Sequence, residues 1–163
     1  MKKVAIVMGS KSDLSVVSEA YDILKRFSVP VVVRVISAHR SIDTVLEFSR
    51  GLKDDGFGVV IAAAGKAAHL AGVVAANTSI PVIGLPIRSS TLDGLDSLLS
   101  TVQMPSGIPV ATVAINGAVN AGILAMQILA VSDQDLYNAL CNERVSLKEK
   151  QAKDDRSITA QYN

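Results

Sequence analysis

The fold class of this chain is indicated most clearly by the stretch Phe57-Gly58-Val59-Val60-Ile61-Ala62-Ala63-Ala64-Gly65-Lys66-Ala67-Ala68-His69. Its first half, residues 57–63, is an apolar run without polar alternation, which is typical of a strand buried on both faces of a parallel sheet. A turn at Gly65 follows, and small residues from His69 to Asn77 predict a helix. A buried strand, a short loop and a helix form the unit from which α/β domains are built.

The same unit recurs on both sides of this stretch. Apolar runs predict further strands over residues 4–8, 31–36, 81–85 and 110–115. Helical spacing of apolar residues predicts helices over 13–27, 42–52, 117–130 and 133–150, and a polar loop with a short helix precedes the last strand. This order predicts a single α/β domain over residues 1–163, a three-layer doubly wound parallel sheet with C-terminal helices. The polar tail from about residue 148 is expected to be a solvated helix end that frays.

Charge and cysteine content exclude several classes of protein. The chain has 16 basic and 15 acidic residues, a net charge of +1, which gives no reason to expect nucleic acid or an anionic membrane as a partner. The single cysteine, Cys141, cannot form an internal disulfide, and with His39 and His69 it offers no metal-ligand spacing. The N-terminus runs directly into the first predicted strand, without the apolar region of a signal peptide. These features predict a cytoplasmic protein without a bound metal.

The apolar content is high, at 49%, although aromatic residues make up only 4%. Residues 109–131 carry no charge, so a membrane span has to be considered. Val110–Ile115 is rich in β-branched residues, however, and Asn116-Gly117 interrupts the run, so a buried strand followed by a small-residue helix explains it better. High apolar content without a membrane span favours a homo-oligomer, in which helices bury faces that a monomer would expose.

The candidate functional residues follow the predicted strands. Ligands of doubly wound sheets bind at the carboxyl ends of the strands, so the segments just after each predicted strand are the candidates. These segments are Gly9-Ser10-Lys11-Ser12-Asp13, Ser37-Ala38-His39-Arg40, Ala64-Gly65-Lys66-Ala67-Ala68-His69 and Pro86-Ile87-Arg88-Ser89-Ser90. Both histidines of the chain lie in them, and we expect them to meet at one edge of the sheet.

Each of the first three segments has a functional and a structural interpretation. The segment from Gly9 to Asp13 offers hydroxyls and a helix N-terminus to a phosphate, but Ser12 or Asp13 could equally be a plain N-cap. In the functional interpretation, His39 transfers a proton near pH 7 and Arg40 holds an anion. In the structural interpretation, His39 is hydrogen-bonded to the backbone and Arg40 is solvated. In the functional interpretation of the segment that ends at His69, its small residues let a substrate approach the backbone. In the structural interpretation, Lys66 is a solvated loop lysine and His69 is the first residue of a helix.

Several motifs resemble those of the N5-carboxyaminoimidazole ribonucleotide mutases, which are the mutase branch of the AIR carboxylase family. The resemblance runs in register from about Val4 to Leu129. It rests on Gly9–Asp13, Ser37–Arg40, Ala67-Ala68-His69-Leu70, Leu92-Asp93-Gly94-Leu95-Asp96-Ser97-Leu98, residues 102–115 and Asn120-Ala121. It implies a flavodoxin-like fold and a homo-octamer without metal or organic cofactor. It also implies a carboxyl transfer in purine biosynthesis, from N5-carboxyaminoimidazole ribonucleotide to 4-carboxy-5-aminoimidazole ribonucleotide.

The same resemblance implies roles for individual residues. His39 is expected to be the proton-transfer residue, Ser10 and Asp13 ribonucleotide contacts, and Arg40 the phosphate clamp. The rest of the substrate pocket is expected to consist of Gly9, Ser12, Ser37, Ala38, Gly65, Lys66, His69 and Leu70. An encounter with the synthetase that makes the labile substrate is also implied, with hand-over by contact or by diffusion both open.

This chain departs from the family pattern in the segment around Gly65. Ala63 and Lys66 stand where the family has glycines, and Ala71 and Ile42 stand where it has prolines. If the backbone at position 66 has a positive φ, lysine there costs roughly 1 kcal/mol or more. Lys66 also adds a cation close to the expected reaction site.

Three alternatives to a mutase remain at this point. The first is a carboxylase of the same family that uses free CO2, which the segment Ala67-Ala68-His69-Leu70 disfavours. The second is a nucleotide-binding module in which Lys66 has ended turnover. The third is a flavodoxin-like or receiver domain, which the absence of tryptophan and of a strand-end pair of aspartates disfavours.

Overall fold

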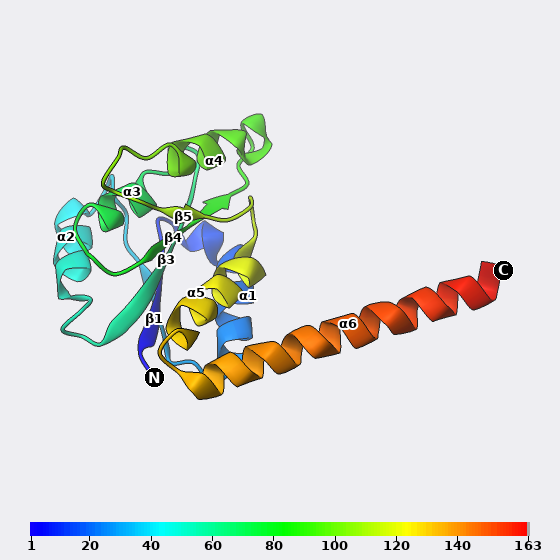
Figure 1. Ribbon diagram of the computed structural model, residues 1–163. Helices are drawn as coiled ribbons and strands as arrows, with labels where there is room; N and C mark the ends of the chain where they lie inside the picture. Colours follow the sequence, from blue (N-terminus) through cyan, green and yellow to red (C-terminus); the bar gives the residue numbers. More distant parts are fainter. Residues whose placement is uncertain (163) are drawn as a thin grey trace.

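A five-stranded parallel sheet forms the centre of the molecule, in the strand order β2-β1-β3-β4-β5 (Figure 1). The computed structural model describes residues 1–162. The strands are β1 (Lys3–Met8), β2 (Val31–Val35), β3 (Phe57–Gly65), β4 (Val82–Ile87) and β5 (Ala111–Thr112). The α-helices are α1 (Leu14–Arg26), α2 (Ile42–Gly51), α3 (Leu70–Ala75), α4 (Leu95–Val102), α5 (Ala118–Ala130) and α6 (Gln134–Tyr162), and two 3-10 turns, η1 (Lys11–Asp13) and η2 (Leu92–Gly94), precede α1 and α4.

The central strand β3 confirms the interpretation of the apolar run. Val59 and Ile61 belong to the core cluster that contains side chains of α1 and α5, whereas Val60 and Ala62 belong to the cluster that contains side chains of α2 and α3. Consecutive residues of a strand point to opposite faces, so both faces of β3 are covered and no polar alternation can be tolerated. The predicted three-layer, doubly wound α/β domain is therefore confirmed.

Close helix packing explains the small residues of the uncharged segment. A Cβ added at Gly122 of α5 would collide with the Ile23 side chain of α1 and would lie tightly, at 3.2 Å, against the backbone carbonyl of Ala20. Ala121 and Ala125 of the same helix are fully buried in this contact layer. The small-residue run is thus a buried helix face, and among the described residues no helix is long and apolar enough to cross a membrane.

The last predicted strand is much shorter than expected. Only Ala111 and Thr112 pair with β4, although residues 110–115 were predicted as a strand. The chain stays beside β4 through single hydrogen bonds, from the Val113 amide to the Gly84 carbonyl and from the Asn116 amide to the Pro86 carbonyl. β-branched composition predicts an extended segment, but it does not show how long the ladder is at a sheet edge.

The end of α6 was also predicted wrongly. The helix continues to Tyr162 rather than ending near residue 150, and it projects away from the sheet and the other helices (Figure 1). Its sequence after Gln134 contains neither glycine nor proline and is rich in lysine, glutamate, glutamine and alanine, all good helix formers. Only Leu136 and Leu140 of this helix are buried, so helix propensity rather than packing explains its length.

Candidate functional site

A cavity of about 620 Å³ lies at the carboxyl ends of the strands, where the sequence predicted a site. It brings together all the predicted pocket residues except His69, which reaches the site through a contact with His39 described below. Its lining also includes residues that were not assigned to the pocket from sequence. The lining residues are Gly9, Ser10, Ser12, Asp13, Ser37, Ala38, His39, Arg40, Ala64, Gly65, Lys66, Ala67, Leu70, Ile87, Arg88 and Ser89.

The segment after β1 arranges two hydroxyls and a carboxylate at the cavity wall. Ser10 is the N-cap of η1, and its Oγ accepts hydrogen bonds from the amide (3.3 Å) and the hydroxyl (2.8 Å) of Ser12. Asp13 precedes α1 but makes no capping hydrogen bond with its side chain. Asp13 thus occupies the N-cap position of α1, as one interpretation of the sequence had it, but its side chain does not cap the helix, and Ser10 caps only the preceding turn η1.

Asp13 as a whole residue is 9% exposed, and burial of its carboxyl raises the pKa above the ordinary value of 3.8. The Ser12 hydroxyl, which lies 3.2 Å from Oδ1 and shares its proton with Ser10 Oγ, and a hydrogen bond from the Ser10 backbone oppose part of that rise in pKa. A buried carboxyl that makes no helix cap and no ion pair within residues 1–162 is costly for folding. Its acceptor oxygens suit the hydroxyl groups of a sugar.

Ser41 closes the segment after β2 into a small ring of hydrogen bonds. The Ser41 hydroxyl accepts from the Ser37 amide at 3.0 Å and contacts the Ser37 carbonyl at 3.2 Å, and it makes no capping bond to α2. This small ring places His39 and Arg40 on the cavity side. Arg40 Nη2 donates to the Gly9 carbonyl at 2.8 Å, so its guanidinium bridges the ends of β2 and β1.

A direct contact joins the two histidines of the chain. His39 Nε2 lies 2.8 Å from His69 Nδ1, and the ring planes are perpendicular with centroids 5.0 Å apart. One nitrogen must donate and the other accept, so the two rings cannot both be imidazolium ions in this arrangement. His69 is the last residue before α3 and comes from the loop after β3. The pair therefore joins two strand ends and leaves a proton-exchanging group at the cavity.

Lys66 has a left-handed backbone, with a φ of 56°. The positive φ considered from the sequence is thus present, and for a residue with a Cβ it costs roughly 1–2 kcal/mol. Ser100 of α4 holds this turn from outside, because its Oγ accepts from the Ala68 amide at 3.2 Å and lies 3.1 Å from the Lys66 carbonyl oxygen. Such strain persists only where the surrounding structure maintains it, and it is common at functional sites.

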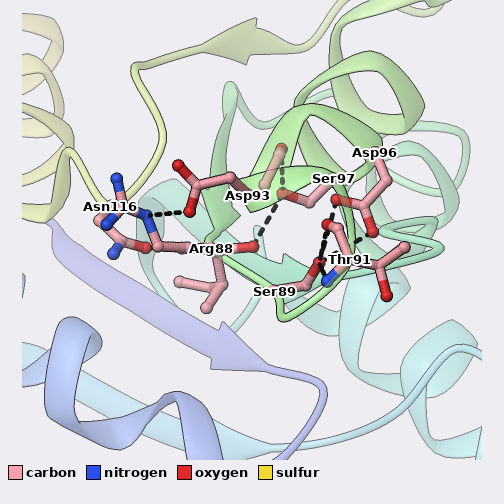
Figure 2. A network of polar contacts seen from close by, with 9 residues as sticks. Arg88, Ser89, Thr91, Asp93, Asp96, Ser97 and Asn116 are labelled. Atoms are coloured by element: carbon pink, nitrogen blue, oxygen red, sulfur yellow. Dashed lines mark hydrogen bonds and ion pairs between the residues drawn. The ribbon is translucent and has the colours of Figure 1, made fainter.

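The segment after β4 adds residues that were not assigned to the pocket from sequence. Arg88 and Ser89 line the cavity, and Figure 2 shows the polar network behind them. Arg88 Nε lies 3.2 Å from Asp93 Oδ1, and the Ser89 hydroxyl lies 2.9 and 3.1 Å from the two carboxylate oxygens of Asp96. Their place directly after a strand was the available signal, but the pairing with Asp93 depends on the unusual left-handed backbone of η2.

The cavity is therefore electrostatically suited to an anionic ligand. Three cationic side chains line it, from Arg40, Lys66 and Arg88, against the one carboxyl of Asp13. Within residues 1–162, no group of three or more histidine, cysteine, aspartate or glutamate side chains is arranged to hold a metal ion. Hydroxyls, cations and a histidine pair together can bind a phosphorylated sugar and transfer a proton.

Comparison with known proteins gives a consistent result. Residues 3–150 match the AIR carboxylase family model. The chain is 53% identical over 148 residues to the N5-carboxyaminoimidazole ribonucleotide mutase of Pyrococcus abyssi, covering 91% of this chain and 85% of the relative. It is 49% identical over 143 residues to the chloroplastic phosphoribosylaminoimidazole carboxylase of Vigna aconitifolia, covering 88% of this chain but 26% of that larger protein. The crystal structure of Treponema denticola PurE superposes with a TM-score of 0.88 at 29% identity, over 95% of this chain and 97% of that one.

Proposed function

Because the chain belongs to the AIR carboxylase family and has the activity of its N5-carboxyaminoimidazole ribonucleotide mutases, we propose that the strand-end cavity is its active site. The activity is an isomerase reaction of purine biosynthesis. In this proposal, His39 is the residue that transfers the proton. The observation that carries it is the 2.8 Å contact between His39 Nε2 and His69 Nδ1 beside a cavity lined by cations.

The proposed reaction moves one carboxyl group within a single binding event. The bond between the carbamate carbon and N5 breaks, which releases CO2 and returns the electron pair to nitrogen, and His39 supplies the proton that nitrogen takes up. C4 of the aminoimidazole then attacks CO2, and His39 removes the proton that C4 carries. Protons balance over the two steps, so one imidazole can act first as acid and then as base.

The phosphate end of the substrate fits the part of the cavity that contains Arg40. One guanidinium nitrogen is bonded to the Gly9 carbonyl, and the remaining donors of the planar group can hold phosphate oxygens. Ser10 and Ser12 add hydroxyls beside it, and the acceptor oxygens of Asp13 suit the ribose hydroxyls. This arrangement fixes the ribonucleotide at one end and directs its base toward His39.

The base end of the cavity has small and apolar walls. Ala38, Ala64, Gly65, Ala67 and Leu70 line it, so few polar side chains compete with a CO2 molecule for its acceptor carbon. A site that excludes water also prevents the loss of CO2 as bicarbonate. The proposed steps are proton transfers and carboxyl transfer, for which these side chains suffice without a metal or an organic cofactor.

We also propose that the protein works as a homo-oligomer, an octamer by resemblance to the family. The support is α6, whose projecting part exposes Val145, Leu147, Ile158 and Tyr162 at fractions of 53–72%. Apolar side chains on a projecting helix are readily buried against another copy of the chain. A cytoplasmic location, supported by the single cysteine, and a transient contact with the synthetase that supplies the substrate belong to the same proposal.

The test is a product assay on the purified protein with freshly prepared N5-carboxyaminoimidazole ribonucleotide and no added bicarbonate. Formation of 4-carboxy-5-aminoimidazole ribonucleotide by the wild type, and its loss in His39→Asn, is the expected result. Product formed only from aminoimidazole ribonucleotide plus bicarbonate would assign the protein to the carboxylases instead. Full activity of His39→Asn would remove His39 from the proton-transfer role.

A further inference from the structure

Lys66 differs from the other two cationic residues of the cavity because its ammonium group has no protein partner. The Arg88 guanidinium pairs with Asp93, and the Arg40 guanidinium donates to the Gly9 carbonyl. Within residues 1–162, the Lys66 ammonium makes neither an ion pair nor a hydrogen bond to another side chain. A lysine in a cavity wall without a protein partner is available to an anion from solution.

The backbone around Lys66 is held in an unfavourable conformation at the same place. Its φ of 56° disfavours any residue with a Cβ, and glycine would adopt it without strain. The Ser100 hydroxyl accepts from the Ala68 amide at 3.2 Å and lies 3.1 Å from the Lys66 carbonyl oxygen, while its shortest contact is to the Asp96 carbonyl of its own helix. The loop that contains the strained lysine is thus anchored to α4 at Ala68, which fits a role for the lysine side chain in binding.

The position of Lys66 indicates which anion it meets. The phosphate is assigned above to Arg40 and the serines after β1, at the other strand ends. Lys66 lies in the same loop as His69, whose ring contacts His39, the proposed proton-transfer residue. The substrate and the product each carry a second anion, a carboxylate, on the group that reacts at His39.

We propose that Lys66 binds the carboxylate of the substrate and of the product, and that it makes the cavity prefer carboxylated ribonucleotides over aminoimidazole ribonucleotide. This inference rests on the proposed function of the cavity. During the reaction the carboxylate becomes neutral CO2, so the attraction to the ammonium is strongest in the bound substrate and product. Lys66 is therefore a specificity residue that favours the ground state, and its removal is expected to raise KM without lowering kcat.

The experiment measures the affinity of two ligands for each variant by calorimetry, namely 4-carboxy-5-aminoimidazole ribonucleotide and aminoimidazole ribonucleotide. Lys66→Gln is expected to lower the affinity for the carboxylated ligand roughly tenfold or more, which is the value of a charge-assisted hydrogen bond. The affinity for aminoimidazole ribonucleotide is expected to change less than about twofold. Lys66→Arg is expected to retain most of the preference. Lys25→Gln, which removes the same charge from an exposed site outside the cavity, is the matched control and should change neither affinity.

Lys66→Gly separates the charge from the backbone strain, because glycine relieves the strain and also lacks the cation. Loss of the preference in Lys66→Gly as well as in Lys66→Gln supports the proposal, and retention of it in either variant overturns it. An equal weakening of both ligands in Lys66→Gln also overturns it. A wild-type protein that binds neither ligand would contradict the proposed function itself, which is a distinct outcome. In turnover, a raised KM with an unchanged or raised kcat is expected for Lys66→Gln, and a lowered kcat with unchanged KM overturns the assignment.

Discussion

The loops Ser37–Arg40 and Gly65–His69 each follow a parallel strand, and each contributes one ring to the His39–His69 contact, but they are held in different ways. The first is closed by Ser41, four residues from its hydrogen-bond partner Ser37. The second has a left-handed residue, Lys66, and is held by a serine of α4. A hydrogen bond between residues four apart can be anticipated from the sequence. A hydrogen bond from a distant helix, such as α4, is visible only once the chain has folded. Under the proposals above, we expect changes in the first loop to affect mainly the chemistry and changes in the second to affect mainly the affinity.

The largest effect is expected at the first loop. His39→Asn keeps a polar side chain of similar size but removes proton transfer, and general acid–base catalysis contributes roughly 10²–10⁴-fold to rate. We therefore expect kcat to fall at least ~100-fold while the affinity for aminoimidazole ribonucleotide stays nearly constant. Turnover by product analysis and binding by calorimetry measure the two quantities. An equal loss of binding would mean that His39 holds the substrate rather than moving its proton.

His69→Phe tests how much the second loop adds to the chemistry. Phenylalanine can retain the perpendicular ring packing but cannot make the 2.8 Å contact to His39 Nε2. Loss of one such hydrogen bond corresponds to a fall in kcat of roughly tenfold. A kcat profile against pH that changes shape between the wild type and this variant would show that His69 acts through the protonation of His39. A loss as large as that of His39→Asn would show that the two rings act as one unit.

Ser41→Ala and Ser100→Ala compare the two supports directly. Each removes a hydroxyl that bonds a loop backbone, so each is expected to lower the free energy of unfolding by about 1 kcal/mol. Ser100→Ala should also cause the greater loss of kcat/KM, since the strained turn at Lys66 then lacks its partner from α4. Urea unfolding and steady-state kinetics on both variants measure this. A greater kinetic loss in Ser41→Ala would reverse the comparison.

Lys66→Gly and Ser28→Gly compare backbone strain inside and outside the cavity. Ser28 has a φ of 57°, almost the same as Lys66, and does not line the site. Relief of left-handed strain, reduced by the greater freedom of glycine when unfolded, should stabilise each variant by about 0.5–1 kcal/mol. Only Lys66→Gly should change ligand affinity. Thermal unfolding checks the stability, and destabilisation of Lys66→Gly would show that the lysine side chain contributes to folding.

The smallest effect concerns Asp13, which lines the same cavity as the first loop. Burial raises the pKa of its carboxyl, so the folded protein holds that proton more tightly than the unfolded chain. Stability is therefore lost as the pH rises from below 3.8 through the raised pKa, and the deficit remains at neutral pH. Asp13→Asn should unfold at a higher urea concentration than the wild type at pH 7, with a difference that shrinks in acid, and should bind ribonucleotide more weakly. A less stable Asp13→Asn at pH 7 would contradict this.

Much of the fold could be predicted from the chain because it depends on local patterns. The apolar run at Val59–Ala62 indicated a strand with two covered faces, and the strand-end rule then brought Ser10, Ser37, His39 and Gly65 to one cavity. The roles of those residues came from the family resemblance and are proposals. What composition could not give was the length of β5, because pairing at a sheet edge depends on the path of the chain around it.

Other features depend on contacts that only the folded chain creates. The Arg88–Asp93 pair occurs where Leu92 and Asp93 both have left-handed backbone, a conformation that aspartate tolerates but leucine disfavours. The His39–His69 contact requires a particular approach of two loops that are 30 residues apart. The lack of glycine and proline indicates that α6 continues to Tyr162, whereas the polarity of the same residues wrongly predicts a frayed end.

The proposal that the carboxyl group is moved within a single binding event is tested by isotope retention. N5-carboxyaminoimidazole ribonucleotide labelled with ¹³C in the carbamate is converted by the wild type in the presence of excess unlabelled bicarbonate, and the product carboxylate is examined by NMR. Retention of most of the label, with no product from His39→Asn, is expected for CO2 held between the apolar wall and His39. Dilution of the label to the level of the bicarbonate pool would mean that CO2 leaves the cavity and that the protein carboxylates aminoimidazole ribonucleotide from solution.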